Sequence, residues 1–116
     1  MAIKTQTYGN TKNILLDPNG AYVIEVQVTN PSGLKAGAVL GGATSALQER
    51  TAILAVVSDN TAQGILLNDL EAGDTNGVMV VRGVIDSSKI ENFATNVPTA
   101  SQNAMKHIIF RNGEYN

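Results

Sequence analysis

Alternating apolar and polar residues predict a β-strand over residues 22–28, between two similar turn sequences. Asp17-Pro18-Asn19-Gly20 and Asn30-Pro31-Ser32-Gly33 each have Asp or Asn first, proline second and glycine fourth, as a type I turn prefers. A period of two is expected of a strand with one buried and one solvent-facing side. The alternating sets are Tyr22, Ile24, Val26 and Val28 on one side and Val23, Glu25 and Gln27 on the other.

Three apolar runs within residues 51–90 predict the centre of the fold, a β-meander. The first run, 52–57, is apolar at every position, and its short length and β-branched residues favour a strand over a helix. The second run covers 64–67 and the third covers 78–85. Polar residues separate the runs, and Asn76-Gly77 is typical of a tight hairpin turn because both residues tolerate positive φ angles.

A short helix over about 100–107 and a last strand over 108–111 complete the predicted elements. Thr99-x-x-Gln102 has the spacing of a capping box, and the apolar residues that follow approximate one helical stripe. Ser88-x-x-Glu91 has the same spacing before a shorter helical turn. The pattern predicts a mainly β protein with one short helix, folded as a small β-sandwich or barrel.

Length and composition indicate one small domain. A chain of 116 residues with 43% hydrophobic residues buries roughly two thirds of its unfolded surface, which leaves a small margin of stability that oligomerisation can raise. The chain has no cysteine, which excludes disulfides and thiolate sites. A net charge of −2 argues against a nucleic-acid partner. No apolar run approaches a membrane span or a signal peptide, so we expect a soluble intracellular product.

Few residues suggest a catalytic, metal-binding or phosphate-binding role. His107 is the only histidine, and we interpret it as a structural residue near the end of the predicted helix. Asp69, Glu71 and Asp74 offer oxygen ligands that could suit calcium, but their spacing is not that of an EF-hand, and a solvated loop is the favoured interpretation. The glycine-rich stretch 33–42 matches neither common phosphate-binding motif and is predicted to hold a short strand at 38–40. We therefore expect no catalytic residues, no metal and no cofactor.

Three segments, GLKAGAVL at 33–40, AQGILLND at 62–69 and GVI at 83–85, follow one another in a suggestive order and spacing. This set resembles the head decoration proteins of tailed bacteriophages, the lambda-type family of capsid-stabilising proteins. The family pattern is a KAGxVL entry to the core, an AxGILxxD strand and turn, and a strand that closes with glycine and aliphatic residues. The resemblance covers about residues 33–90, with a weaker match at Ile108-Ile109-Phe110.

The resemblance implies a structural protein and not an enzyme. A member of this family is expected to be a small β-rich subunit, commonly a homotrimer, that binds the major capsid protein on the outside of the expanded head and stabilises it. The implied location is the outer surface of the virion, after synthesis in the host cytoplasm. Neither a nucleic acid nor a membrane is expected as a partner.

The resemblance also implies two sites. Residues 1–16 have the composition of a flexible N-terminal arm that orders on the shell, followed by a single β-rich domain over 17–116. Strand addition by such an arm would use backbone hydrogen bonds and alternate apolar side chains. The expected capsid-binding residues are Ile3, Tyr8, Ile14, Leu15 and Leu16. The expected subunit-interface residues, on a strand that is apolar on both faces, are Val78, Val80, Val81 and Val84.

Two other classes of protein fit the same sequence. A different virion component, such as a head fibre or a tail protein, would share the composition and the trimeric habit. A small enzyme or ligand-binding β-domain would be recognised by a pocket with converging polar groups.

Overall fold

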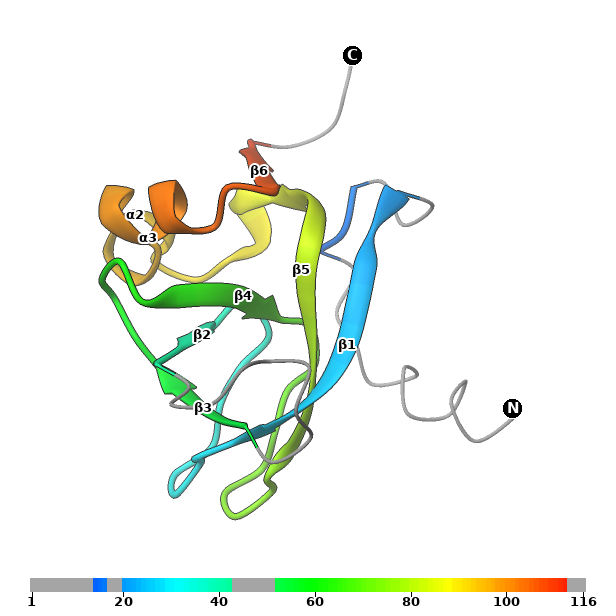
Figure 1. Cartoon of the computed structure of the whole chain (residues 1–116), viewed down its shortest axis with the longest axis vertical. Coiled ribbons are helices and arrows are strands. Elements are labelled where there is room, and N and C mark those ends of the chain that lie inside the picture. The colour runs from blue at the N-terminus through cyan, green and yellow to red at the C-terminus, as the bar shows by residue number, and fades with distance from the viewer. Residues whose placement is uncertain (1–13, 17–19, 43–51, 113–116) are drawn as a thin grey trace.

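Five strands close into a barrel, and a sixth strand extends it at one edge (Figure 1). The computed structural model describes residues 14–16, 20–42 and 52–112. Neighbouring strands follow the order β1-β3-β2-β4-β5-β6, and a further pairing of β1 with β5 closes the ring of five. This confirms the mainly β, barrel-like fold predicted above. The strands are β1 (Tyr22–Val28), β2 (Val39–Gly41), β3 (Ile53–Val56), β4 (Ala62–Leu66), β5 (Asn76–Asp86) and β6 (Ile108–Arg111).

The three successive strands β3, β4 and β5 do not form the predicted meander, because β2 lies between β3 and β4. Leu40 of β2 is the Cα partner of Val56 on one side and of Gly64 on the other. β3 in turn pairs in parallel with β1, with Ile53 opposite Gln27 and Leu54 opposite Val28. A strand of three residues carries too little periodicity to reveal that it is central.

β5 is the strand at which the others meet. It pairs antiparallel with β1 and β4 and parallel with β6. Tyr22 of β1 is opposite Arg82, whereas the next residue, Val23, is opposite Val80, so β5 carries one extra residue at this point. Such a β-bulge bends the strand and turns the residues beyond it to the other face. Residues on the two sides of the bulge therefore do not follow one alternation along β5.

Two separate apolar cores fill the molecule. The first, the barrel core, lies inside the barrel, since all five barrel strands contribute to it. Its buried residues are Val26, Val28, Leu40, Leu54, Leu66, Leu70 and Met79. The second, the outer core, lies between the outside of the barrel and the chain that follows β5. Its buried residues are Ile14, Val39, Ala62, Ile65, Leu67, Val78, Val80, Ile85, Ile90, Val97, Met105 and Ile108.

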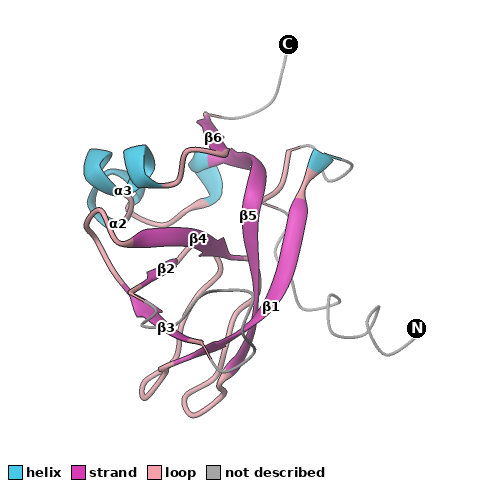
Figure 2. Cartoon of the chain, in the orientation of Figure 1, coloured by secondary structure: helices cyan, strands magenta, loops and turns pink. Residues whose placement is uncertain are grey.

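Three short helical segments connect β5 to β6, where the sequence predicted one helix (Figure 2). They are the 3₁₀ helix η2 (Ser87–Lys89), α2 (Phe93–Asn96) and α3 (Thr99–Ala104). α3 therefore ends three residues earlier than predicted. The chain turns after it, where the amide of Ile108 donates to the carbonyl of Met105 (3.1 Å), and then pairs with β5.

The two predicted capping boxes are wrong. No side chain caps α3, and Gln102 Nε2 instead donates to the carbonyl of Val97 at 3.0 Å. The cap of η2 is Asp86, whose Oδ1 accepts from the amide of Ser88 at 3.0 Å. Spacing alone did not reveal either contact, because each acceptor lies outside the predicted box.

The turn before β5 lies earlier than predicted. The amide of Asp74 donates to the carbonyl of Glu71 at 2.9 Å, and Gly73 within this turn has a φ of +92°. Asn76 and Gly77 belong to β5 itself, and Gly77 is buried. The prediction of a hairpin turn at these two residues is therefore wrong, and the positive φ angle is supplied by Gly73.

Candidate functional site

The N-terminal residues that the structure describes belong to the domain. Leu15 is bridged to Ile85 in an antiparallel sense, and the amide of Asp86 donates to the carbonyl of Ile14 at 2.7 Å. Ile14 is only 2% exposed and lies in the outer core. The arm boundary predicted at residue 16 is thus corrected to a point before residue 14.

This position changes the expected capsid-binding set. The side chain of Ile14 is buried by its own chain and does not reach the surface in this fold. Leu15 and Leu16 are half-buried beside it, with the Leu16 amide bonded to the carbonyl of Val84 at 2.9 Å. The other two members, Ile3 and Tyr8, lie outside the described residues.

The predicted subunit-interface residues on β5 are mostly used within one chain. Val78 and Val80 are 1% and 0% exposed and pack in the outer core. Val81 packs against the barrel core, on the opposite face, and Val84 is half-buried. Both faces of β5 are apolar because the strand is central, so Val78 and Val80 are corrected to core residues.

The carboxylates of the loop before β5 stabilise backbone turns. Asp69 Oδ1 accepts from the amide of Ala36 at 2.9 Å, and Asp74 Oδ2 accepts from the amide of Glu71 at 3.2 Å. Within residues 14–16, 20–42 and 52–112, no three His, Cys, Asp or Glu side chains gather as a metal site. The geometry therefore gives these oxygens a role in shaping the loop.

Asn30 has a larger structural role than the turn position that its sequence indicated. Its side chain is buried, at 5% exposure. Nδ2 donates to the carbonyls of Glu71 (2.8 Å) and Asp74 (2.9 Å), while Oδ1 accepts from the amide of Gly33 (2.8 Å). One buried amide thus joins the turn after β1 to the turn before β5.

His107 and Asp59 are two further polar residues whose surroundings bear on a possible catalytic role. His107 is exposed, and its backbone carbonyl accepts from the amide of Gly83 at 3.1 Å. The hydroxyl and the amide of Thr61 both donate to Asp59 Oδ1, and these bonds lower the pKa of the Asp59 carboxyl. The backbone carbonyl of Asp59 also accepts from the buried hydroxyl of Ser101 at 2.9 Å, which ties the loop between β3 and β4 to α3.

The glycine-rich segment directs its amides into the fold. The amide of Gly37 donates to the carbonyl of Leu66 at 2.7 Å, while the neighbouring Ala36 amide is bonded to Asp69. Gly37 has a φ of +101°, and a Cβ atom there would lie 3.1 Å from Cγ1 of Ile90. These glycines allow close packing, and the amides are not gathered to bind a phosphate.

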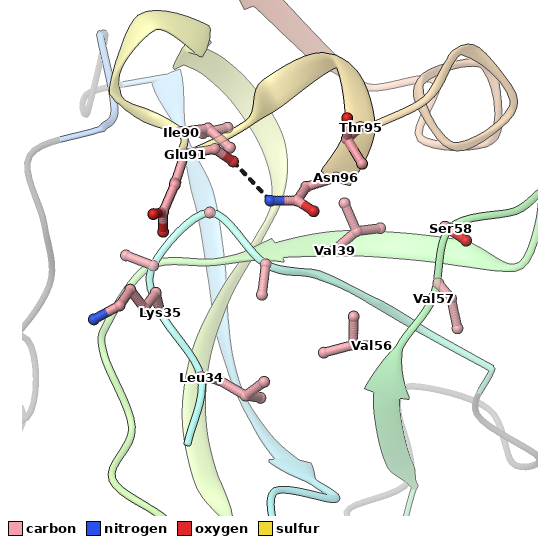
Figure 3. Close-up of a pocket in the computed structure, with 13 residues that line it drawn as sticks. Leu34, Lys35, Val39, Val56, Val57, Ser58, Ile90, Glu91, Thr95 and Asn96 are labelled. Atoms are coloured by element: carbon pink, nitrogen blue, oxygen red, sulfur yellow. Dashed lines mark hydrogen bonds between the residues drawn. The ribbon is translucent and has the colours of Figure 1, made fainter. Parts of the chain in front are cut away.

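A surface concavity lies beside this segment (Figure 3). It has a volume of about 230 Å³ and is called the hollow below. Three parts of the chain line it: residues 34–39, the end of β3 with Val57 and Ser58, and the helical region 90–96. The hollow therefore lies where the barrel meets the helical segments.

Apolar side chains form most of the hollow and charged groups lie beside them. Figure 3 shows Val39, Val56 and Val57 around its centre, with Lys35 and Glu91 together on one side. Asn96 Nδ2 donates to the backbone carbonyl of Glu91 at 2.7 Å and so fixes this wall. Such an arrangement can accept an apolar side chain and a charged neighbour.

Val56 is the residue of this site that sequence reasoning missed. It lies in the run 52–57, which is apolar at every position, yet it is 53% exposed. Leu54 in the same strand is 1% exposed. A run that is apolar at every position does not indicate which of its members is uncovered.

Comparison of the sequence with models of protein families and with curated proteins finds no match. None of the helices in the described part of the chain is long and apolar enough to span a bilayer. The candidate site is therefore defined by geometry alone. It consists of the hollow and of residues 14–16, which bond to β5 and are called the N-terminal anchor below.

Proposed function

We propose that this protein is a capsid decoration protein of a tailed bacteriophage. It binds the major capsid protein on the outer surface of the expanded head, as a trimer, and stabilises that state. It has no catalytic activity or cofactor in this role. One observation supports the proposal most: the first two segments that carry the resemblance, which are apart in the sequence, pair with one another in the fold.

The contacts between these segments are made by the backbone. In the first two, Val39 of β2 is the Cα partner of Ile65 of β4. The amide of Leu66 donates to the carbonyl of Ala38 at 2.9 Å, and the amide of Gly37 donates back to Leu66. β4 pairs with β5 at Met79 and Val80. The third segment, 83–85, lies further along β5 and pairs with β6. The first two segments thus form one continuous part of the barrel.

The N-terminal anchor is consistent with an arm that leaves a rigid base. The backbone bonds of Ile14 and Leu16 to β5 fix the point at which residues 1–13 join the domain. Apolar positions remain in this segment at Ile3 and Tyr8. A trimer would present three such segments at once, and the raised effective concentration would give tight attachment from weak single contacts. Binding only the expanded shell would stabilise that state by mass action.

The experiment that tests the proposal is co-sedimentation of the purified protein with expanded and unexpanded undecorated heads of the same phage. We expect saturable pelleting with expanded heads alone. Pelleting with neither form would contradict the proposal and direct the search to tail or fibre fractions.

A second experiment tests the arm. Deletion of residues 2–12 retains Ile14 and its bonds to β5, so the domain should keep its stability while its affinity for expanded heads falls at least tenfold. Ile3→Ser with Tyr8→Ser in the full-length chain is the matched control, because it removes only the apolar side chains. Unchanged affinity in both variants would exclude residues 2–12 as the capsid contact.

A further inference from the structure

Two surface features of the barrel fit one another, and they lie on different sides of it. We propose that Tyr22 of one copy inserts into the hollow of the next copy, with Arg82 beside Glu91, in a head-to-tail contact repeated around a ring. This interface deepens the proposed function, since it supplies the contact of the trimer that the function includes.

Tyr22 is the inserting group because of its exposure and its support. Its side chain is 61% exposed, the highest value among the large hydrophobic residues that are exposed in the described chain. It begins β1 and lies opposite Arg82 of β5, at the β-bulge described above. Because β1 and β5 pair here, the backbone that carries Tyr22 and Arg82 is held in a sheet. A rigid aromatic residue beside an arginine is a usual composition of an interface hot spot.

The hollow fits one large side chain better than a small ligand. Its volume of about 230 Å³ is below the ~300–1,000 Å³ of typical small-molecule pockets. Val56 lines it and is 53% exposed, so an inserted ring would cover apolar surface that the chain itself leaves open. Gly37 and Ile90, packed together at its edge, keep that side of the hollow in place.

The two features carry opposite charges at Arg82 and Glu91, and Lys35 lies on the same side of the hollow as Glu91 (Figure 3). Arg82 is exposed beside Tyr22, and Glu91 is exposed at the hollow. In the part of the chain that the structure describes, neither side chain has an ion-pair or hydrogen-bond partner. Insertion of Tyr22 would bring a cation to the side of the hollow that carries Glu91 and would partner both charges.

The positions of the two features determine the kind of assembly. The start of β1 lies on one side of β5, whereas β2, β3 and α2 lie on the other (Figure 1). β1 then crosses β5, and its end pairs with β3. Two different patches that fit one another make a heterologous contact, which closes into a ring when its rotation allows. A two-fold dimer would instead need one patch that is complementary to itself.

The test is sedimentation velocity of the full chain across a range of concentrations, with the fold checked by circular dichroism. We expect a closed oligomer for the wild type and at least ~30-fold weaker association for Tyr22→Ala, the effect of losing a hot-spot residue. Ile53→Ala is the matched control, since Ile53 is 53% exposed on β3 but does not line the hollow. It should leave association unchanged.

A charge exchange makes the test independent of any effect on folding. Arg82→Glu and Glu91→Arg should each weaken association, and the double variant should restore it. Unchanged association of Tyr22→Ala, or no recovery in the double variant, would overturn the interface and leave the trimer of the proposed function standing. A monomeric wild type would also overturn it, whereas pelleting with expanded heads decides the proposed function separately.

Discussion

The barrel core and the outer core are built from different kinds of sequence. Each strand of the barrel contributes to the barrel core with its inward face, so the residues recur with the period of two that a strand imposes. The outer core combines the outward faces of β4 and β5 with residues from helices, loops and the N-terminal anchor. The first core follows from the strand pattern, whereas the second depends on how separate segments meet. Both surfaces proposed for binding lie outside the barrel core.

The largest expected effect is a loss in the free energy of unfolding, and it should be greater for a leucine of the barrel core than for an isoleucine of the outer core. Leu66 is 0% exposed and surrounded by strands, so Leu66→Ala should lower the free energy of unfolding by about 4–5 kcal/mol. Ile90 is 6% exposed and lies beside the hollow, where neighbours can relax, so Ile90→Ala should cost about 2–3 kcal/mol. Urea denaturation measures both. Equal losses would show that the two cores are equally rigid.

The next prediction concerns the N-terminal anchor. Ile14→Ala should lower the free energy of unfolding by about 2–4 kcal/mol, because it removes a side chain that is 2% exposed in the outer core. Deletion of residues 2–12 should change it by less than about 0.5 kcal/mol. Thermal denaturation of both variants provides the comparison. A neutral Ile14→Ala would mean that the outer core does not include the anchor.

A smaller loss is expected at Asn30, which links two turns next to the barrel core. Asn30→Ala removes three hydrogen bonds and should cost about 1–3 kcal/mol. Asn30→Asp is a matched control, since it retains an acceptor for the amide of Gly33 and loses the two donors to Glu71 and Asp74. Hydrogen exchange of the Gly33 amide should rise in the alanine variant and much less in the aspartate variant. Equal exchange rates in both variants would exclude this bond as a support of the turn.

The smallest expected effect is the pH dependence at Asp59, on the loop that connects β3 to β4. The bonds from Thr61 lower the pKa of Asp59 below its ordinary value of 3.8. A lowered pKa stabilises the fold above pH 3.8, and this contribution is lost as the pH falls through the lower pKa of the folded state. Thr61→Val should raise the Asp59 pKa, which an NMR titration of its carboxyl carbon measures. An unchanged pKa would show that the hydroxyl bond is not formed in solution.

The sequence predicted features that depend on local pattern and missed those that depend on contacts between distant segments. The alternation over 22–28 predicted β1 with its correct bounds, and the final strand at 108–111 was also correct, because short-range patterns determine both. The position of β2 between β3 and β4 was missed, since strand order depends on contacts between distant segments. The bulge at Arg82 was missed because its cause is the register of β1.

The candidate site was less predictable than the fold. Val78 and Val80 were assigned to a subunit interface because an apolar strand does not reveal whether its own chain covers it. The apolar run 52–57 likewise does not reveal that Val56 is exposed and lines the hollow. Exposure of apolar residues is a property of the packed molecule, and sequence periodicity alone does not determine it.

Electron cryomicroscopy of expanded heads incubated with saturating protein would test the proposed function most directly. We predict groups of three barrels on the outer surface near three-fold positions. The start of β1 in each barrel should face the hollow of the neighbouring barrel. Expanded heads that remain bare at saturating protein would contradict capsid decoration.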